Sequence, residues 1–322
     1  MRYGLPYKGS KNAIAEWIVN KLPKAEIFVD LFFGGGAVTH RAMLSGKYDR
    51  FIVNDIDARL PGLFLECAYG KHTIEKHPEW VTREEFNARK AEDVYTALVW
   101  SFGNNGKDYL YGVDIEEMKH AYHIACYENN VEPLKAWGYH LQKSDKVEVY
   151  ERYLEYQRQV KTQSPQCQLE IVTRQTEIER LQSLQSLQSL QSLQSLQSLQ
   201  SLQSHGTDFS AVPIPKGALI YCDIPYTGTN CGKYGGFDHK HFYEWAERQD
   251  NIFISEYWMP DNFIQYAQIE KTVLSASNGN SQTAKEKIYT NRRTYERMTD
   301  EQKELIRAWN GEQMNIEDLI GW

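Results

Sequence analysis

The stretch EIFVDLFFGGGAVTHRAMLSGKYDRFIVND, residues 26–55, decides the fold. Its apolar start, Glu26–Phe33, predicts a buried strand that runs into the glycine turn Gly34–Gly36. The following residues, Ala37–Leu44, predict a helix, and Phe51–Val53 predicts a second buried strand. A strand, a helix and a second strand in this order favour an α/β fold with a doubly wound parallel sheet.

The same pattern continues on both sides of this unit. Upstream, Ala13–Leu22 has the apolar spacing of a helix, and downstream ALIYC, Ala218–Cys222, predicts a buried strand that ends at Asp223. Further elements are expected towards the C-terminus: a helix around His239–Arg248, strands at Ile252–Ser255, Val273–Leu274 and Lys287–Tyr289, and a closing helix from Asp300 to Asn310.

The segment between the second strand and Asp223 has a different character, because it is mostly polar and helical in pattern. We therefore expect an interrupted sheet domain, formed by residues 1–62 and 209–295. The interruption divides into a helical region at 63–180 and a low-complexity repeat at 181–204, and a helical tail follows at 296–322.

The repeat consists of LQS triplets that run without a break from Leu181 to Ser204. At about 100° per residue each leucine falls about 60° short of the one before it, so no single apolar face forms. A helical arm is the preferred interpretation, followed by a partly ordered spacer and then by a short-period β-solenoid. Because the repeat carries no charge, we expect it to act only as a spacer that chemistry does not need.

The composition excludes several classes of protein. The chain has 322 residues and a net charge of −7, which argues against holding nucleic acid by bulk positive charge but allows a local basic groove. We expect no membrane segment and no secretory signal, because no apolar run is long enough. The scattered cysteines contain no CxxC pair, which favours a reduced, cytoplasmic compartment without zinc or disulfides.

The glycine turn and the acid that follows the second strand are the first candidate site. Glycines there let a ligand approach the backbone, and Asp55 comes 19 positions after Gly36, a spacing typical of ribose recognition. Thr39 stands where the dinucleotide fingerprint has its third glycine, so the pattern favours a nucleoside cofactor without phosphates. A plain tight turn is the alternative interpretation.

Two further motifs bear chemistry. In YCDIPY, residues 221–226, Asp223 lies at the carboxyl end of a strand, and Tyr226 has a ring that can stack on a base. In PYKGSK, residues 6–11, a basic segment before a helix can hold a carboxylate. A capped turn and an ordinary helix start are the alternatives. Cys222 should point away from the site into the core.

These motifs together resemble the Dam-type, alpha-group DNA adenine-N6 methyltransferases, especially their phage-borne branch. The matching segments are PYKGSK, VDLFFGGGAVT, FIVNDID, YCDIPY with the downstream pair Thr229 and Tyr234, FDHKHFYEWA, NIFISEYWMPD and, in the insert, WSFGNNGKDYLYG. Their order also agrees with the family, since the glycine motif precedes an insert and the catalytic motif follows it. The resemblance implies that the insert at 63–180 is the target-recognition region, which WSFGNNGKDYLYG opens.

The resemblance implies a Rossmann-like enzyme that moves a methyl group from S-adenosylmethionine to N6 of a flipped adenine in double-stranded DNA. It implies no metal, a monomer, and the cytoplasm of a prokaryotic or phage-infected cell. The cofactor-binding residues that it implies are Tyr7, Lys11, Asp30, Phe32, Gly34, Gly36, Asp55 and Asp223. The catalytic residues that it implies are Asp223, Ile224, Pro225 and Tyr226, in the D-P-P-Y motif.

One departure from the family leaves alternatives open. Ile224 stands where the family motif has its first proline, so the chain could be a catalytically weak or inactive relative that binds DNA. A second alternative changes the target to cytosine N4 or to RNA. A third, an interaction protein built around the LQS repeat, is disfavoured by the complete set of motifs.

Overall fold

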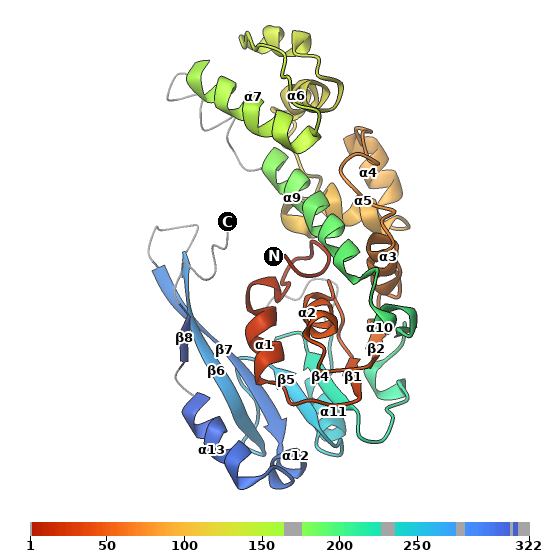
Figure 1. The fold of residues 1–322 in the computed structure, drawn as a ribbon, viewed down its shortest axis with the longest axis vertical. Coiled ribbons are helices and arrows are strands. Elements are labelled where there is room, and N and C mark those ends of the chain that lie inside the picture. Colours follow the sequence, from red (N-terminus) through yellow and green to blue (C-terminus); the bar gives the residue numbers. More distant parts are fainter. Residues whose placement is uncertain (1, 164–175, 227–235, 275–280, 310–311, 315–322) are drawn as a thin grey trace. The chain divides into compact units, whose positions relative to one another are not determined.

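The computed structural model describes residues 2–163, 176–226, 236–274, 281–309 and 312–314 (Figure 1). The chain divides into two compact units, which we call the sheet unit and the helical unit. The sheet unit comprises Met1–Gly4, Lys11–Gly62 and Leu193–Trp322, and the helical unit comprises Leu5–Ser10 and Leu63–Ser192.

The sheet has eight strands within the described residues, in the order β3-β2-β1-β4-β5-β7-β6-β8. Neighbouring strands from β3 to β5 pair in parallel, whereas β7 is antiparallel to both β5 and β6. The strands are β1 Ile27–Asp30, β2 Arg50–Asn54, β3 Gln203–His205, β4 Leu219–Asp223, β5 Ile252–Ser255, β6 Phe263–Leu274, β7 Ser281–Asn291 and β8 Glu312–Met314. The predicted α/β, Rossmann-like sheet is confirmed.

The helices that accompany this sheet include those expected next to the motifs. They are α1 Ala15–Lys21, α2 Ala37–Ser45, α10 Gln197–Gln200, α11 His239–Ala246, α12 Arg292–Glu296 and α13 Asp300–Trp309, while α3 Arg59–Ala68 crosses from the sheet unit into the helical unit. Short 3₁₀ turns lie at Asn12–Ile14 and Phe209–Ala211. Gly36 and Gly46, both in the left-handed conformation, cap the two ends of α2, as glycine prefers.

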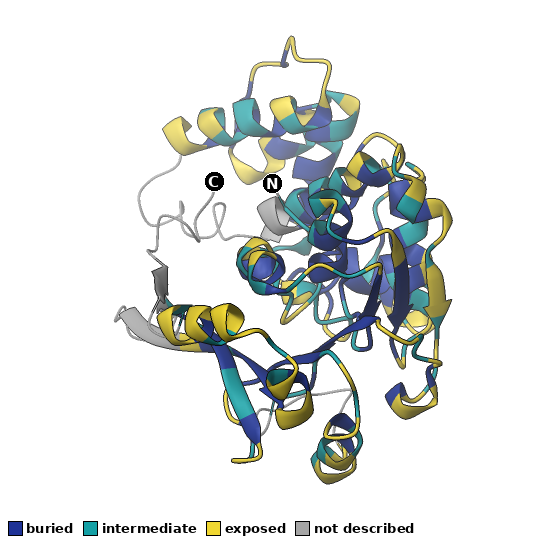
Figure 2. Cartoon of the chain, turned by 60° about the horizontal axis from the view of Figure 1, so that its bottom comes forward, coloured by how far each residue is buried: buried dark blue, intermediate teal, exposed yellow. Residues whose placement is uncertain are grey.

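The central parallel strands β1, β2, β4 and β5 are buried on both faces, which explains their continuous apolar sequences, whereas the edge strand β3 is polar and mostly exposed (Figure 2). On one face, Val29 and Ile220 belong to a core cluster that also contains Phe242 of α11. On the other face, the rings of Phe28 and Tyr221 stack with centroids 6.3 Å apart. Cys222 lies in the first cluster and is fully buried, so its predicted role as a core residue is confirmed.

Two parts of the sheet differ from expectation. The short strands expected at Val273–Leu274 and Lys287–Tyr289 belong to the long antiparallel hairpin of β6 and β7. The end of the LQS repeat pairs with β2 as strand β3, where a spacer was expected. Sequence periodicity misses both features. The hairpin strands contain many polar residues and are stabilised by pairing with each other, and β3 depends on pairing with β2, which is distant in sequence.

The helical unit contains α4 Arg83–Arg89, α5 Val94–Val99, α6 Glu116–Glu128, α7 Val149–Gln163 and α9 Thr176–Ser189, with 3₁₀ turns at Phe102–Asn104, Glu132–Trp137 and Leu190–Leu193. Side chains begin two of these helices, since Thr82 and Glu85 form a capping box at α4 and Asp93 caps α5. The loop WSFGNNGKDYLYG is closed by a bridge between Ser101 and Tyr109.

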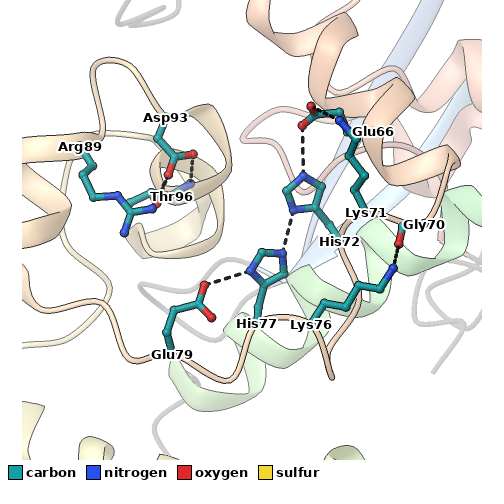
Figure 3. A network of polar contacts seen from close by, with 10 residues as sticks. All are labelled: Glu66, Gly70, Lys71, His72, Lys76, His77, Glu79, Arg89, Asp93 and Thr96. Atoms are coloured by element: carbon teal, nitrogen blue, oxygen red, sulfur yellow. Dashed lines mark hydrogen bonds and ion pairs between the residues drawn. The ribbon is translucent and has the colours of Figure 1, made fainter.

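A polar network lies within the helical unit (Figure 3). The rings of His72 and His77 share a hydrogen bond of 2.9 Å between Nδ1 and Nε2, and the outer ring nitrogens contact carboxylates of Glu66 and Glu79. Tyr95 stacks on both imidazoles. Burial lowers the pKa of His72, and the neighbouring carboxylate of Glu66 opposes this shift. The network links the end of α3 to the segment before α4.

The LQS repeat is part of the core, so its interpretation as a spacer is wrong. Its first half is helical, as preferred, but Leu181, Leu184, Leu187 and Leu190 are fully buried. The leucines do spiral around the helix, yet each of these four is buried, while Gln188 between them remains exposed. The small Ser183 and Ser186, also buried, allow close packing between the leucines.

Candidate active site

The glycine turn is tied to the end of β2 by Asp55. The carboxylate of Asp55 accepts hydrogen bonds from the main-chain N–H groups of Gly34, at 2.7 Å, and Asp57, at 2.9 Å. Gly36 has a φ of 67°, and a Cβ there would lie 2.3 Å from Cζ of Phe33. Only glycine therefore accommodates this turn, which brings the start of α2 close to Asp55.

Asp30 is a buried carboxylate at the end of β1. Its Oδ2 accepts a hydrogen bond of 2.7 Å from the hydroxyl of Thr39, whereas its Oδ1 has no hydrogen-bond partner among the described residues. Burial raises the pKa of Asp30 to about 7, and the hydroxyl of Thr39 opposes this shift. A buried acceptor without a partner is costly, so this oxygen is suited to a ligand that brings a donor or a positive charge.

Asp223, at the end of β4, forms an ion pair with Lys11. The ammonium nitrogen lies 3.0 Å from Oδ1, and the two side chains are 11% and 21% exposed. Burial raises the pKa of Asp223, and the Lys11 ammonium opposes this shift. Because β1 and β4 pair in parallel, with Asp30 opposite Tyr221, the carboxylates of Asp30 and Asp223 lie at the same edge of the sheet.

Tyr226 completes this cluster three residues after Asp223. Lys11 lies over its ring, with the ammonium 4.4 Å from the centroid, and the ring of Tyr257 meets it edge-on at 4.5 Å. The hydroxyl donates a hydrogen bond of 3.1 Å to Oε2 of Glu286 on β7. Burial raises the pKa of Tyr226 well above its usual value, so the phenol remains a hydrogen-bond donor.

The two residues between Asp223 and Tyr226 are held from different sides. Ile224 is buried, 2% exposed, and its side chain belongs to the sheet core. The carbonyl of Pro225 accepts a hydrogen bond of 2.8 Å from Nε2 of His239, the first residue of α11. The main chain of YCDIPY is therefore anchored to the sheet on one side and to α11 on the other.

The remaining predicted site residues occupy other positions. Phe32 packs its ring against the aromatic side chains of Phe209, Phe237 and Phe242 in the core. Tyr7 belongs to the helical unit, where its carbonyl accepts a hydrogen bond of 3.0 Å from the N–H of Ser10. The downstream pair, Thr229 and Tyr234, lies outside the described residues.

Sequence reasoning did not assign several side chains that contact YCDIPY, among them Tyr257, His239 and Glu286. His239 lies in a segment that resembles the family, but nothing in its neighbours indicates a bond to Pro225. Glu286 lies 60 positions beyond Tyr226, in a strand that was only partly predicted. The one available signal was a charged residue at a strand position that alternates with Lys285 and Lys287.

Among the described residues, no group of three or more His, Cys, Asp or Glu side chains is placed to hold a metal ion. No described helix has the length and apolar character needed to cross a membrane.

Comparison with known protein families identifies the chain. Residues 7–257 match the family of D12 class N6 adenine-specific DNA methyltransferases. A search of curated proteins finds no match. The family match includes Lys11, the glycine turn, Asp55 and YCDIPY, which agrees with the Dam-type resemblance and favours adenine in DNA over cytosine N4 and RNA. The chain therefore belongs to the D12 class N6 adenine-specific DNA methyltransferases, enzymes that methylate adenine in DNA at specific sites.

Proposed function

We propose that the methyl donor is S-adenosylmethionine and that Lys11, Asp223 and Tyr226 form the centre where it meets the adenine. The observation that carries this proposal is their contact at the carboxyl edge of the sheet, with the ammonium of Lys11 between the carboxylate and the ring. In open α/β sheets this edge is where ligands bind.

The groups around the glycine turn fit the cofactor chemically. S-adenosylmethionine has a sulfonium, an ammonium, a carboxylate and a ribose diol. The unpaired oxygen of Asp30 suits a cationic group, and the carboxylate of Asp55, beside the glycine turn, is the kind of acceptor that ribose hydroxyls bind. The first turn of α2 has no side-chain cap, so its N–H groups suit a carboxylate. These features support the assignment of the turn to cofactor binding.

The residues of YCDIPY then act on the adenine. When bound, the cofactor supplies an electrophilic methyl group. The amino nitrogen of adenine is a poor nucleophile, because its lone pair is delocalised into the ring. In our proposal, Asp223 and the main-chain carbonyl of Ile224 accept hydrogen bonds from the two N–H groups of the adenine amino group. These bonds favour a pyramidal nitrogen and aim its lone pair at the methyl group. Such preorganised acceptors commonly contribute several kcal/mol to catalysis, about 3 kcal/mol for a single group.

The adenine must leave the duplex to reach this site, as in other enzymes that modify bases. We propose that it stacks on the ring of Tyr226, an interaction worth about 1–3 kcal/mol per base. The helical unit is proposed to carry target recognition. We further propose a cytoplasmic monomer, as the resemblance to the Dam-type enzymes implies.

Cofactor binding tests this assignment directly. Calorimetry should show that the wild type binds S-adenosylmethionine and that Asp55→Ala weakens binding at least tenfold, because the ribose loses its acceptor and the turn loses its anchor. Asp49→Ala, at an exposed carboxylate beyond the other end of β2, is the matched control and should bind like the wild type. Equal affinity of Asp55→Ala and wild type would remove Asp55 from the cofactor site.

A further inference from the structure

Glu286 is a buried carboxylate of the active site that lies outside the segment matched by the family. That segment ends at residue 257, whereas Glu286 belongs to β7. It is 5% exposed, although glutamate is rarely buried without a partner. Its burial in the candidate site therefore indicates a role for Glu286, and the family match does not assign one.

Strand register explains how Glu286 reaches the site. Side chains alternate along a strand, and Glu286 shares its face of β7 with the fully buried Ile288 and Thr290. Ile288 lies opposite Ser255, the last residue of β5, and β7 runs antiparallel to β5. Glu286 therefore lies just beyond the carboxyl end of β5, the edge of the sheet where Asp223 ends β4.

The contacts of Tyr226 show what Glu286 does there. A tyrosine ring that only stacks on a base could rotate about its own bonds, but this ring is held at its hydroxyl by Glu286, over one face by Lys11 and at its edge by Tyr257. The hydroxyl contact is a hydrogen bond to a carboxylate, which is stronger than one between neutral groups. Of these three contacts, it is the one with a directional requirement, and it acts beside a side-chain hydrogen bond between Tyr226 and Asp223.

We propose that Glu286 is a positioning residue for methyl transfer, which acts through the hydroxyl of Tyr226 to hold that ring in the orientation that receives the flipped adenine. The inference rests on the proposed role of Tyr226 and extends it to a residue on β7. Glu286 itself touches neither adenine nor cofactor in this proposal, so its effect belongs to the catalytic step and not to binding of the cofactor.

Kinetics of five proteins test the proposal: wild type, Glu286→Ala, Glu286→Gln, Tyr226→Phe and the double variant Tyr226→Phe/Glu286→Ala. The substrates are tritium-labelled S-adenosylmethionine and DNA from a host without adenine methylation. We expect Glu286→Ala to lower kcat about tenfold, the effect of losing a charged hydrogen bond that orients a reacting group. The KM for DNA and the calorimetric affinity for the cofactor should stay within about twofold.

Two comparisons separate positioning from other roles. Glu286→Gln keeps an oxygen that accepts the hydrogen bond from the Tyr226 hydroxyl, so its kcat should lie close to that of the wild type. If the negative charge of Glu286 were what matters, Glu286→Gln would be as slow as Glu286→Ala. Tyr226→Phe removes the partner, so Glu286→Ala should cause little further loss in that background. Glu270→Ala, which removes a carboxylate that pairs with Lys285 on the same hairpin, is the matched control and should behave like wild type.

The outcomes are distinct. If the wild type is active and Glu286→Ala is equally active, this inference alone is overturned. The same holds if Glu286→Ala lowers kcat by the same factor in the wild type and in Tyr226→Phe. A wild type that transfers no methyl group contradicts the proposed function and the inference together. If Glu286→Ala does not fold, Tyr226→Phe and Glu286→Gln decide the matter, because full activity of Tyr226→Phe would mean that the hydroxyl anchor is dispensable.

Discussion

Ile224 shows how a departure from a family motif can be tolerated. The proposed mechanism needs a carbonyl oxygen at this position, and isoleucine has one. Pro225 restricts Ile224 to extended backbone, which keeps that carbonyl oriented. The buried isoleucine side chain also packs in the sheet core, which a proline ring would not fill equally. The side chain therefore packs in the fold, and in the proposed mechanism the main-chain carbonyl takes part in the reaction.

We predict that Ile224→Pro changes the methylation rate less than about tenfold. Proline would remove the remaining backbone freedom of this position, an effect of about 1 kcal/mol, and would lose part of the core packing. The test measures the rate of tritium transfer and the melting temperature of the wild type and of Ile224→Pro. An inactive wild type that Ile224→Pro revives would identify the chain as a relative that only binds DNA.

Asp30 should make the stability of the protein without cofactor depend on pH. Burial raises its pKa to about 7 in the folded state, above the ordinary value of 3.8, so folding favours the protonated form. The stability that this proton provides is present below pH 3.8 and is lost as the pH rises through 7, by up to about 4 kcal/mol. Asp30→Asn cannot ionise, so it should be more stable than wild type at pH 8 and should lose less stability between pH 5 and pH 8.

Denaturant unfolding at both pH values checks this expectation. Asp145→Asn, at a carboxylate with a side chain 86% exposed, is the control and should follow wild type. The same pH dependence in Asp30→Asn and wild type would show that the proton is not on Asp30.

Single site residues could be predicted from the sequence where they directly follow a recognisable strand. Asp223 and Asp55 follow apolar strands, and the carboxyl ends of parallel strands meet at one edge. Lys11 belongs to a basic segment that the residues alone mark as able to hold a carboxylate, and the resemblance assigned it to cofactor binding; its ion pair with Asp223 was not predicted. Glu286 and His239 were missed, because their role depends on tertiary contacts that no local pattern records.

At the scale of elements, the LQS repeat shows that a sequence without an amphipathic face can still form a core helix. Leu187→Ala should lower the free energy of unfolding by about 2–5 kcal/mol, because it removes a fully buried side chain. Gln188→Ala, its exposed neighbour, should change it by less than about 0.5 kcal/mol. Denaturant titration of both variants makes the comparison, and equal stabilities would restore the interpretation of the repeat as a spacer.

The elements of the first 55 residues were predicted well, because strand, glycine turn and helix each have a strong local signal. β1, α2 and β2 lie within a few residues of their expected bounds. The hairpin of β6 and β7 was predicted only in fragments, since its strands contain many polar residues and are stabilised by pairing with each other. β3 was not predicted, because two of its three residues belong to the LQS repeat and the strand exists through its pairing with β2.

At the scale of the whole molecule, the chain combines a sheet unit that is discontinuous in sequence with a helical unit inserted into it. The described site residues of the sheet unit come from three distant parts of the chain: Lys11, the segment from Asp30 to Asp55, and the segment from Asp223 to Glu286. The parallel topology brings them to one edge. This arrangement explains why the order of the motifs was informative although each motif alone was weak.

Transfer of tritium from labelled S-adenosylmethionine to unmethylated duplex DNA, followed by nucleoside chromatography, tests the central claim most directly. The wild type should place the label on N6-methyldeoxyadenosine. Asp223→Ala should be slower by about 10²–10³, because it removes an acceptor from the reacting amino group. Label on another nucleoside, no label from the wild type, or an Asp223→Ala variant as active as wild type would contradict the account.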